Sequence, residues 1–272
     1  MARSPTRQRE PVLRADAGAQ IVVRRALFAA CWLLLAAGCV GTGTPERGTS
    51  EERLRAHLDL ATGYYEIGDL NRAKMPLEYA LQIDRTSWEA HDLLGRIYQQ
   101  EGELALAEKA FRQAVRSAPD NARVRNDYGV FLYQRGRYAD AVDELRLAVR
   151  DPDNPRRSVA YENLGLASLQ IGDRDLARAS FERAVILDRQ LVVSLLELAH
   201  LSFQDGEFDE AAAYYERYRS NARQSPRSLW LGIQLARVAG DSNAIASYAL
   251  QLRNLYPYSD EYRLYRESVA DG

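Results

Sequence analysis

Cysteine is nearly absent from this sequence, which has only Cys31 and Cys39 among its 272 residues. A small fold held together by several disulfides is therefore excluded, and stability has to come from packing. An excess of one charge is also missing, because 36 Lys and Arg stand against 38 Asp and Glu without any basic block. Nucleic acid is therefore not an expected partner.

Long apolar runs are missing as well, and the main run that is present is short. Residues 26–37 are uncharged and follow two arginines. Twelve helical residues rise only about 18 Å, well below the roughly 30 Å of a bilayer core. A basic flank, a short apolar run and small residues before a break are typical of a secretory signal. We therefore predict that residues 1–38 are a signal peptide that is removed.

The residues before this run do not look like the start of such a signal, because they include Glu10 and Asp16. We therefore expect translation to begin further along, at Val22 or Val23.

Residues 35–39 have the sequence LAAGC, which resembles a bacterial lipobox. The resemblance implies cleavage before Cys39 and a lipid on its thiol, whereas an ordinary signal peptide with a chance cysteine is the alternative. By resemblance to proteobacterial lipoproteins, Val40 after the cysteine favours the periplasmic face of the outer membrane. Several acyl chains would anchor the protein stably. Residues 39–53 are polar after the cysteine and are predicted to form a lipidated flexible tether.

Glycine is present in ordinary amount, but six glycines recur at intervals of 34, 34, 36, 34 and 34 residues. A period of this length is typical of a repeat array. If each glycine is position 15 of a unit, small residues recur at positions 8 and 20, and large ones at position 24. The six glycines are Gly68, Gly102, Gly136, Gly172, Gly206 and Gly240.

Each repeated position has a physical reason. Apolar residues at positions 7, 11, 24 and 28 follow helical spacing, so each unit is predicted to be two helices, A and B, joined at the glycine. The glycine accepts the left-handed conformation that ends helix A, and an acidic residue at position 16 lies at the positive end of helix B. Small residues at positions 8 and 20 allow the two helices to approach closely beside the bulky residue at position 24.

These positions together resemble the tetratricopeptide repeat, and residues 88–121 match it best. The resemblance implies an all-α fold, a right-handed superhelical solenoid of six repeats, with two extra residues near 151–155 and a C-terminal capping helix in 260–272. The predicted units are 54–87, 88–121, 122–157, 158–191, 192–225 and 226–259.

In tetratricopeptide repeats the ligand-facing side chains come mainly from positions 2, 5, 9 and 12 of helix A, on the concave side. In this sequence, positions 2, 5, 9 and 12 of helix A are largely apolar outside the second unit. An apolar strip of this kind is expected to bind another polypeptide. The alternative is that the same residues pack against neighbouring A helices as core. The predicted binding residues are Leu58, Tyr65, Val130, Tyr133, Leu166, Leu169, Val193, Leu196, Phe203 and Trp230.

The polar residues on this side of the first two units are expected to form a solvated face, and the alternative is a clamp that recognises charged groups of a partner. They are Arg55, Glu89, Asp92 and Arg96.

The sequence offers little that could support catalysis. Only three histidines are present, His57, His91 and His200, and no pair of them has metal-binding spacing. Phosphate-binding GxxxxGK and nucleophile-elbow GxSxG motifs do not occur. We therefore predict a protein that is not an enzyme and has no metal, no small-molecule substrate and no cofactor apart from covalent lipid at Cys39.

The lipobox, the six repeats and the segment 228–262, SLWLGIQLARVAGDSNAIASYALQLRNLYPYSDEY, together resemble the PilF/PilW family of type IV pilus biogenesis lipoproteins. The resemblance implies a pilotin, which brings the pilus secretin to the outer membrane and helps it to multimerise. The secretin would then be the partner held by the apolar strip. The alternative is a general scaffold lipoprotein that recruits cell-wall synthesis or other outer-membrane assembly factors.

Overall fold

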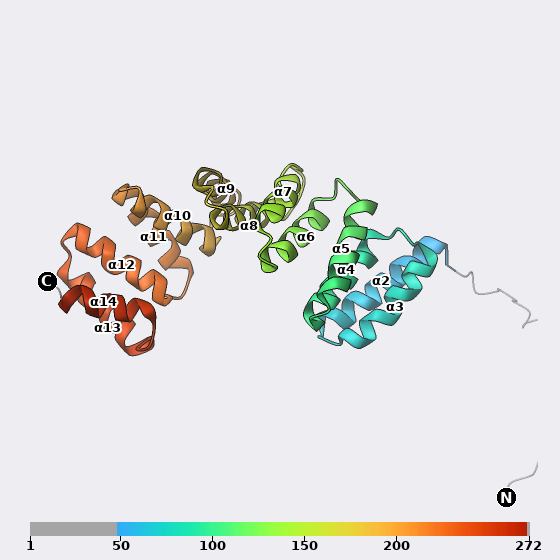
Figure 1. Cartoon of the computed structure of the whole chain (residues 1–272), viewed down its shortest axis with the longest axis horizontal. Helices are drawn as coiled ribbons and strands as arrows, with labels where there is room; N and C mark the ends of the chain where they lie inside the picture. The colour runs from blue at the N-terminus through green and yellow to red at the C-terminus, as the bar shows by residue number, and fades with distance from the viewer. Residues whose placement is uncertain (1–47, 271–272) are drawn as a thin grey trace, which may run out of the picture. The chain divides into compact units, whose positions relative to one another are not determined.

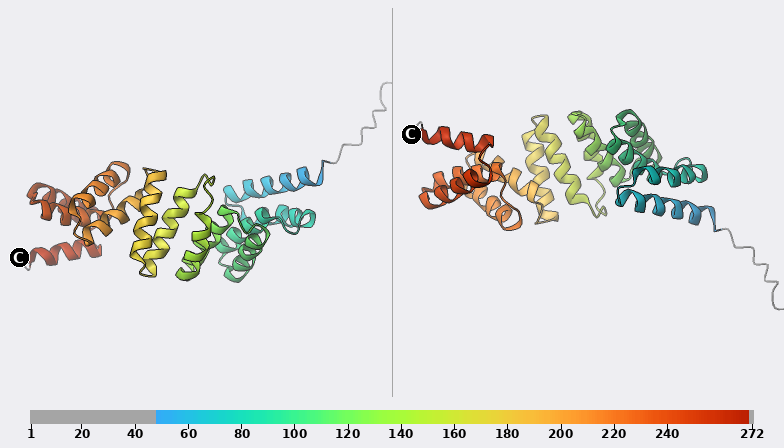
Figure 2. Two further views of the ribbon diagram at one scale, coloured as in Figure 1. Left: turned by 90° about the horizontal axis from the view of Figure 1, so that it is seen from above. Right: turned by 90° about the horizontal axis from the view of Figure 1, so that it is seen from below.

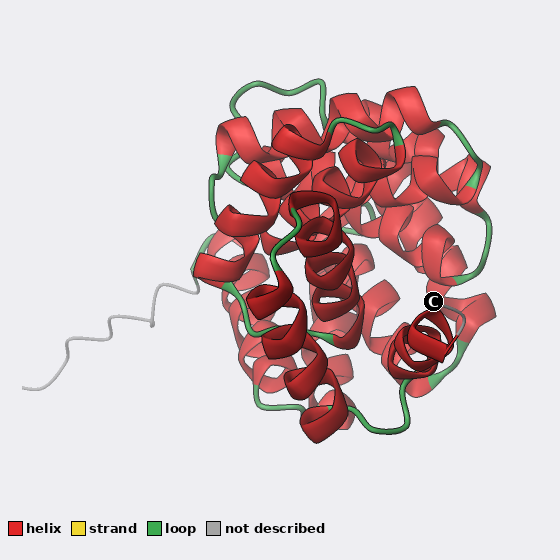
Figure 3. Ribbon diagram, turned by 90° about the vertical axis from the view of Figure 1, so that its left-hand side faces the viewer, coloured by secondary structure: helices red, strands yellow, loops and turns green. Residues whose placement is uncertain are grey.

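The computed structural model describes residues 48–270, and within this range all regular structure is α-helical (Figures 1 and 3). The predicted all-α fold is confirmed. The predicted signal peptide and Cys39 lie outside the described residues. The helices are α2 (Ser50–Glu66), α3 (Leu70–Ile83), α4 (Trp88–Glu101), α5 (Leu104–Ser117), α6 (Ala122–Gln134), α7 (Tyr138–Ala148), α8 (Arg157–Gln170), α9 (Arg174–Leu187), α10 (Val192–Gln204), α11 (Phe208–Asn221), α12 (Pro226–Ala239), α13 (Ser242–Leu255) and α14 (Asp260–Ala270).

The helices are arranged in consecutive antiparallel pairs, from α2 with α3 to α12 with α13, and each pair packs on the next one along the chain (Figure 2). These six pairs are the six predicted repeats. The last helix of the described range, α14, is not half of a pair there and packs against α12 and α13.

The turn inside each repeat depends on glycine. All six periodic glycines have positive φ, between +69° and +80°, and no non-glycine residue in 48–270 does. Gly102 and Gly240 cap their helices in the left-handed conformation, and their N–H groups bond the last carbonyls. A side chain is strained in this conformation, which explains why glycine recurs at position 15.

Close approach of helices A and B explains the small residue at position 8. A Cβ added to Gly95 would lie 2.8 Å from Cδ1 of Phe111, and one added to Gly165 would lie 2.6 Å from Cε1 of Phe181. Both phenylalanines are fully buried. The bulky position-24 residue therefore occupies the space that the glycine leaves open.

The first helix begins earlier than the tether prediction allows, at Ser50 and not at residue 54. The Oγ atom of Ser50 accepts a hydrogen bond from Arg53, and Glu51 forms an ion pair with Arg55 at 3.8 Å. The acidic residues in the first turn also stabilise the helix, because its N-terminal end carries a partial positive charge. These local interactions extend helix A of the first repeat into the segment predicted as tether.

The two extra residues between the third and fourth repeats lie in the loop between α7 and α8. Arg157, the first residue of α8, donates a hydrogen bond from Nε to the carbonyl of Val149 at 2.8 Å. The loop therefore lengthens the connection, while α7 and α8 still pack against each other.

Candidate functional site

The predicted binding residues, which we name the A-helix strip, lie on the first helix of each repeat. Most of them are partly exposed and also touch the buried core, so neither a purely solvent-facing nor a purely core role describes them. Val193 is 39% exposed, whereas Leu196 is 9% exposed and belongs to the core. The burial of Leu196 therefore favours the alternative that this residue packs in the core.

The centre of the strip contains a hollow of about 200 Å³ between α6, α7 and α8, lined by Val130, Tyr133, Gln134, Leu145, Asn163 and Leu166. We name it the central hollow. Leu145 is completely buried beneath it. The Tyr133 ring meets Tyr138 edge-on with ring centres 5.3 Å apart, and burial raises the pKa of its hydroxyl. The hollow is therefore lined by apolar groups and neutral polar groups.

Two amide pairs connect consecutive repeats at the hollow. Gln99 Nε2 donates to Gln134 Oε1 at 2.5 Å, and Asn163 Nδ2 donates to Asn126 Oδ1 at 2.9 Å. Gln134 and Asn163 also line the central hollow. One amide pair therefore connects α4 with α6, and a second, separate pair connects α6 with α8.

The expected solvated face on the second repeat is wrong for Asp92. This side chain is buried, and neither carboxylate oxygen has a hydrogen-bond donor in the described part of the chain. Its nearest cation is Arg123, whose Nη2 lies 3.6 Å away, too far for a good hydrogen bond. Burial and the neighbouring Asp127 raise the pKa of Asp92 to about 7, although Arg123 and Arg96 oppose the shift. Asp92 is covered because the next repeat packs across α4.

A second buried charge lies further along the array. Glu197 accepts two hydrogen bonds from Arg227 of the following repeat, one of them 2.8 Å long. Nearby, burial and the Arg227 charge lower the pKa of His200 to about 4, so its imidazole is neutral at physiological pH. Within residues 48–270 no cluster of three or more His, Cys, Asp or Glu could hold a metal ion.

An apolar surface at the start of the array, which we name the end face, was not predicted from the sequence. Leu60, Met75 and Tyr79 are 50%, 58% and 47% exposed, and they surround a hollow of about 330 Å³ together with His57, Tyr64, Arg72 and Pro76. In the second repeat the residue equivalent to Leu60 is Leu94, which is 8% exposed. The end face is uncovered because no repeat precedes the first one in the described chain. Apolar positions in a terminal unit were the signal that could have revealed it.

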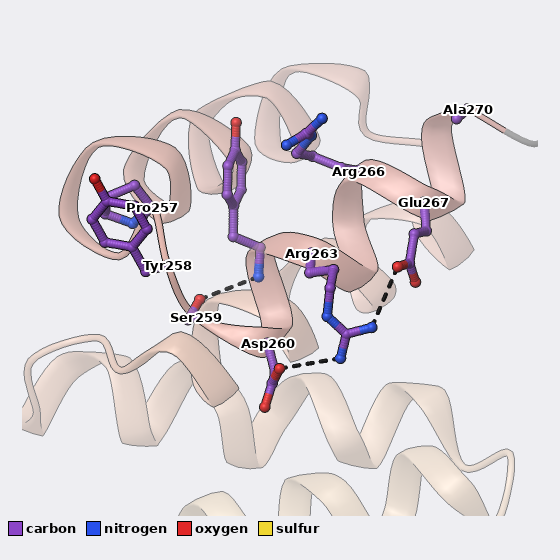
Figure 4. A pocket seen from close by; sticks show the side chains of 9 residues that line it. Pro257, Tyr258, Ser259, Asp260, Arg263, Arg266, Glu267 and Ala270 are labelled. Atoms are coloured by element: carbon purple, nitrogen blue, oxygen red, sulfur yellow. Dashed lines mark hydrogen bonds and ion pairs between the residues drawn. The ribbon is translucent and has the colours of Figure 1, made fainter.

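The opposite end carries a more polar hollow of about 460 Å³ around the start of α14 (Figure 4). Arg263 lies between Asp260 and Glu267 and pairs with both, at 3.1 and 3.3 Å. The charges along this helix therefore neutralise one another, while Tyr258 beside them is 99% exposed.

Comparison with known proteins agrees with this architecture. The tetratricopeptide repeat model matches residues 93–155 and 162–228. The chain is 41% identical over 231 residues to the type IV pilus assembly protein PilF of Pseudomonas aeruginosa, across 83% of this chain and 91% of that protein. The chain belongs to the PilF family. The structure of this chain is also similar to a solved structure of P. aeruginosa PilF, with a TM-score of 0.78 and 40% sequence identity. The alignment covers 81% of this chain and 100% of that one.

A crystal structure of PilW, a widely conserved type IV pilus biogenesis factor, is also similar, with a TM-score of 0.65 and 30% identity. The alignment covers 78% of this chain and 97% of PilW. The resemblance to the PilF/PilW family is therefore confirmed, and this PilF-family chain is a scaffold and not an enzyme. None of the helices in the described range has the length and apolarity needed to cross a membrane.

Proposed function

We propose that the protein is a pilotin of the type IV pilus. In this proposal lipid on Cys39 anchors it to the periplasmic face of the outer membrane, and the A-helix strip holds a segment of the pilus secretin. The observation that carries the proposal is the 41% identity to a pilus assembly protein over most of both chains. The protein would act by placing and shielding its client, without a chemical step.

The A-helix strip supports a binding role through apolar groups that are partly exposed. Burial of one large aliphatic or aromatic side chain stabilises a complex by about 1.5–3 kcal/mol, and a few such anchors dominate most interfaces. The strip offers several such groups on successive repeats. Because successive repeats stack side by side, an extended segment of a partner could contact the apolar groups of several A helices at once.

The client assignment is tested by deleting the gene. We expect twitching motility and SDS-resistant secretin multimers to be lost, while secretin monomer is still present. Secretin multimers at the normal level in the deletion strain would contradict the pilotin proposal and favour the general scaffold.

The anchor is tested separately with Cys39→Ser. We expect the variant and the secretin to leave the outer-membrane fraction together, because the acyl chains supply the membrane affinity. If the variant fractionates like the wild-type protein, the anchor proposal fails and the rest of the function still stands.

The binding surface is tested with two double variants, Tyr133→Ala with Leu169→Ala on the strip and Leu60→Ala with Met75→Ala on the end face. Tyr258→Ala, at a fully exposed position, is the control. We expect the strip variant to reduce recovery of secretin with the purified protein by roughly tenfold or more, since two anchors are lost. Thermal unfolding of each variant checks that the array is intact. If only the end-face variant loses secretin binding, the binding site lies on the end face and not on the A-helix strip.

A further inference from the structure

We propose that the central hollow binds one uncharged aliphatic side chain of an extended polypeptide, and that the amides of Gln134 and Asn163 hydrogen-bond the backbone of that same residue. This inference rests on the proposed function only in taking the partner to be a polypeptide, and it specifies what the A-helix strip recognises.

The dimensions of the hollow indicate a side chain as its occupant. Its volume of about 200 Å³ is far more than a single water molecule needs. Val130, Leu145 and Leu166 supply its aliphatic lining, and the Tyr133 ring adds an aromatic wall. Apolar hollows of this kind are filled favourably by apolar groups, because water leaves both surfaces.

The charge of the lining selects the type of side chain. None of the six lining residues carries a charge, and the raised pKa of Tyr133 keeps its hydroxyl protonated. A lysine or aspartate entering the hollow would lose its water without gaining a partner of opposite charge, which is costly. An uncharged aliphatic side chain has no such cost.

The rim supplies one free donor group and one free acceptor. Gln134 uses its Oε1 to accept from Gln99, and its Nε2 has no partner among the described residues. Asn163 uses its Nδ2 to donate to Asn126, and its Oδ1 has no partner there either. One residue of an extended chain presents a carbonyl and an N–H group, which is the complementary pair.

The corresponding positions at the neighbouring repeat boundaries differ in charge. The boundary between the second and third repeats has Arg96 and Asp127 at the equivalent places, and the boundary between the fourth and fifth has Glu197. The row of equivalent sites is therefore charged on both sides of the central hollow. An aliphatic side chain of a partner would therefore bind at the boundary between the third and fourth repeats and not at the two adjacent boundaries.

The test selects peptides from a phage-displayed library of random linear peptides on the full-length protein in detergent. We expect the selected peptides to share one aliphatic residue, and we expect replacement of that residue by aspartate to abolish binding. The variant Leu166→Trp fills the hollow and should lower peptide affinity roughly tenfold or more. Leu187→Trp makes the same change at an exposed position of α9 and should leave affinity unchanged.

Three outcomes would overturn the inference: no peptide is enriched, the shared residue is charged, or the selected peptides bind Leu166→Trp as tightly as the unmodified protein. If Leu166→Trp unfolds, Val130→Phe fills the same hollow from α6 and gives the same readout. The result is independent of the secretin experiment. Normal secretin multimers in the deletion strain with peptide binding intact would reject the pilotin role alone, whereas the reverse result would reject the hollow alone.

Discussion

Asp92 is a carboxylate buried at the boundary between α4 and α6, with Arg96 and Arg123 near it but not hydrogen-bonded to it. Arg96 lies over the ring of Tyr65, 4.4 Å from its centre, and Arg123 also approaches Asp127. Because both arginines interact with other groups, the negative charge of Asp92 is poorly compensated. The folded protein therefore holds a proton on Asp92 up to about pH 7, whereas the unfolded chain releases it near pH 3.8.

The variant Asp92→Asn should make stability less dependent on pH. Between pH 3.8 and about 7 the native state of the wild type binds more protons than the unfolded state, so its free energy of unfolding falls as pH rises through this window. Asparagine does not titrate. We expect the variant to match the wild type near pH 4 and to exceed it above pH 7 by on the order of 1–3 kcal/mol. Urea unfolding at a series of pH values measures this difference.

His200 changes stability in the opposite sense, because its lowered pKa makes the native state lose stability as pH falls from 6.5 towards about 4. The same histidine is present in both proteins, so its contribution cancels in the comparison. A stability difference that stays constant between pH 4 and 8 would show that Asp92 keeps an ordinary pKa.

The acidic residues before the B helices differ in whether they cap the helix, according to the length of the side chain. Asp241 accepts hydrogen bonds from the backbone N–H groups of Asn243 and Ala244, at 3.0 and 2.9 Å. Glu103 occupies the equivalent position and makes no side-chain cap bond. We expect Asp241→Ala to lower the free energy of unfolding by about 1 kcal/mol, and Glu103→Ala to change it by less than about 0.5 kcal/mol. Equal losses in denaturant unfolding would mean that charge near the helix end, and not capping, matters.

At the scale of the element, the contact between helices A and B limits what position 8 can hold. Gly165→Ala should lower the free energy of unfolding by about 1–3 kcal/mol, because its Cβ would lie 2.6 Å from the buried Phe181 ring. Gly63→Ala is the matched control, since it lies in α2 with nothing within 4 Å of an added Cβ. The control should stabilise the protein by up to about 1 kcal/mol through helix propensity. Thermal unfolding of both variants should therefore move in opposite directions.

Helix boundaries could be predicted from the sequence where the signal is local. Glycine at position 15 ends a helix through its own conformation, and the period located every repeat. The burial of Asp92 could not be predicted in this way, because it depends on the packing of α6 across α4. The exposure of Leu60 likewise depends on there being no described repeat before α2, and the central hollow depends on the position of Leu145 of α7 beneath α6 and α8. Features that require two or three repeats together therefore appeared only in the structure.

At the scale of the whole array, α14 covers the last repeat. Tyr262 and Tyr265 pack against the core there, and Arg237 of α12 donates to Ser268 at 2.7 Å. A chain that stops after Ser259 should therefore show faster amide hydrogen exchange in α12 and α13. Exchange in α2 to α5 should not change, because repeats contact only their neighbours. Faster exchange throughout the array would instead indicate that it unfolds as one cooperative unit. Val269→Ala, at an exposed position of α14, serves as the control that keeps the helix.

The contacts between helices extend at most two helices along the chain at every point of the described array. No repeat has to wait for a distant segment before it can bury its apolar face. Chains with such local contacts fold quickly, since little loop-closure entropy is lost before native contacts form. We therefore expect folding to proceed from one end while the rest of the chain is still emerging from a ribosome or a translocation channel, and the first repeats to be ready for a partner before the last ones exist.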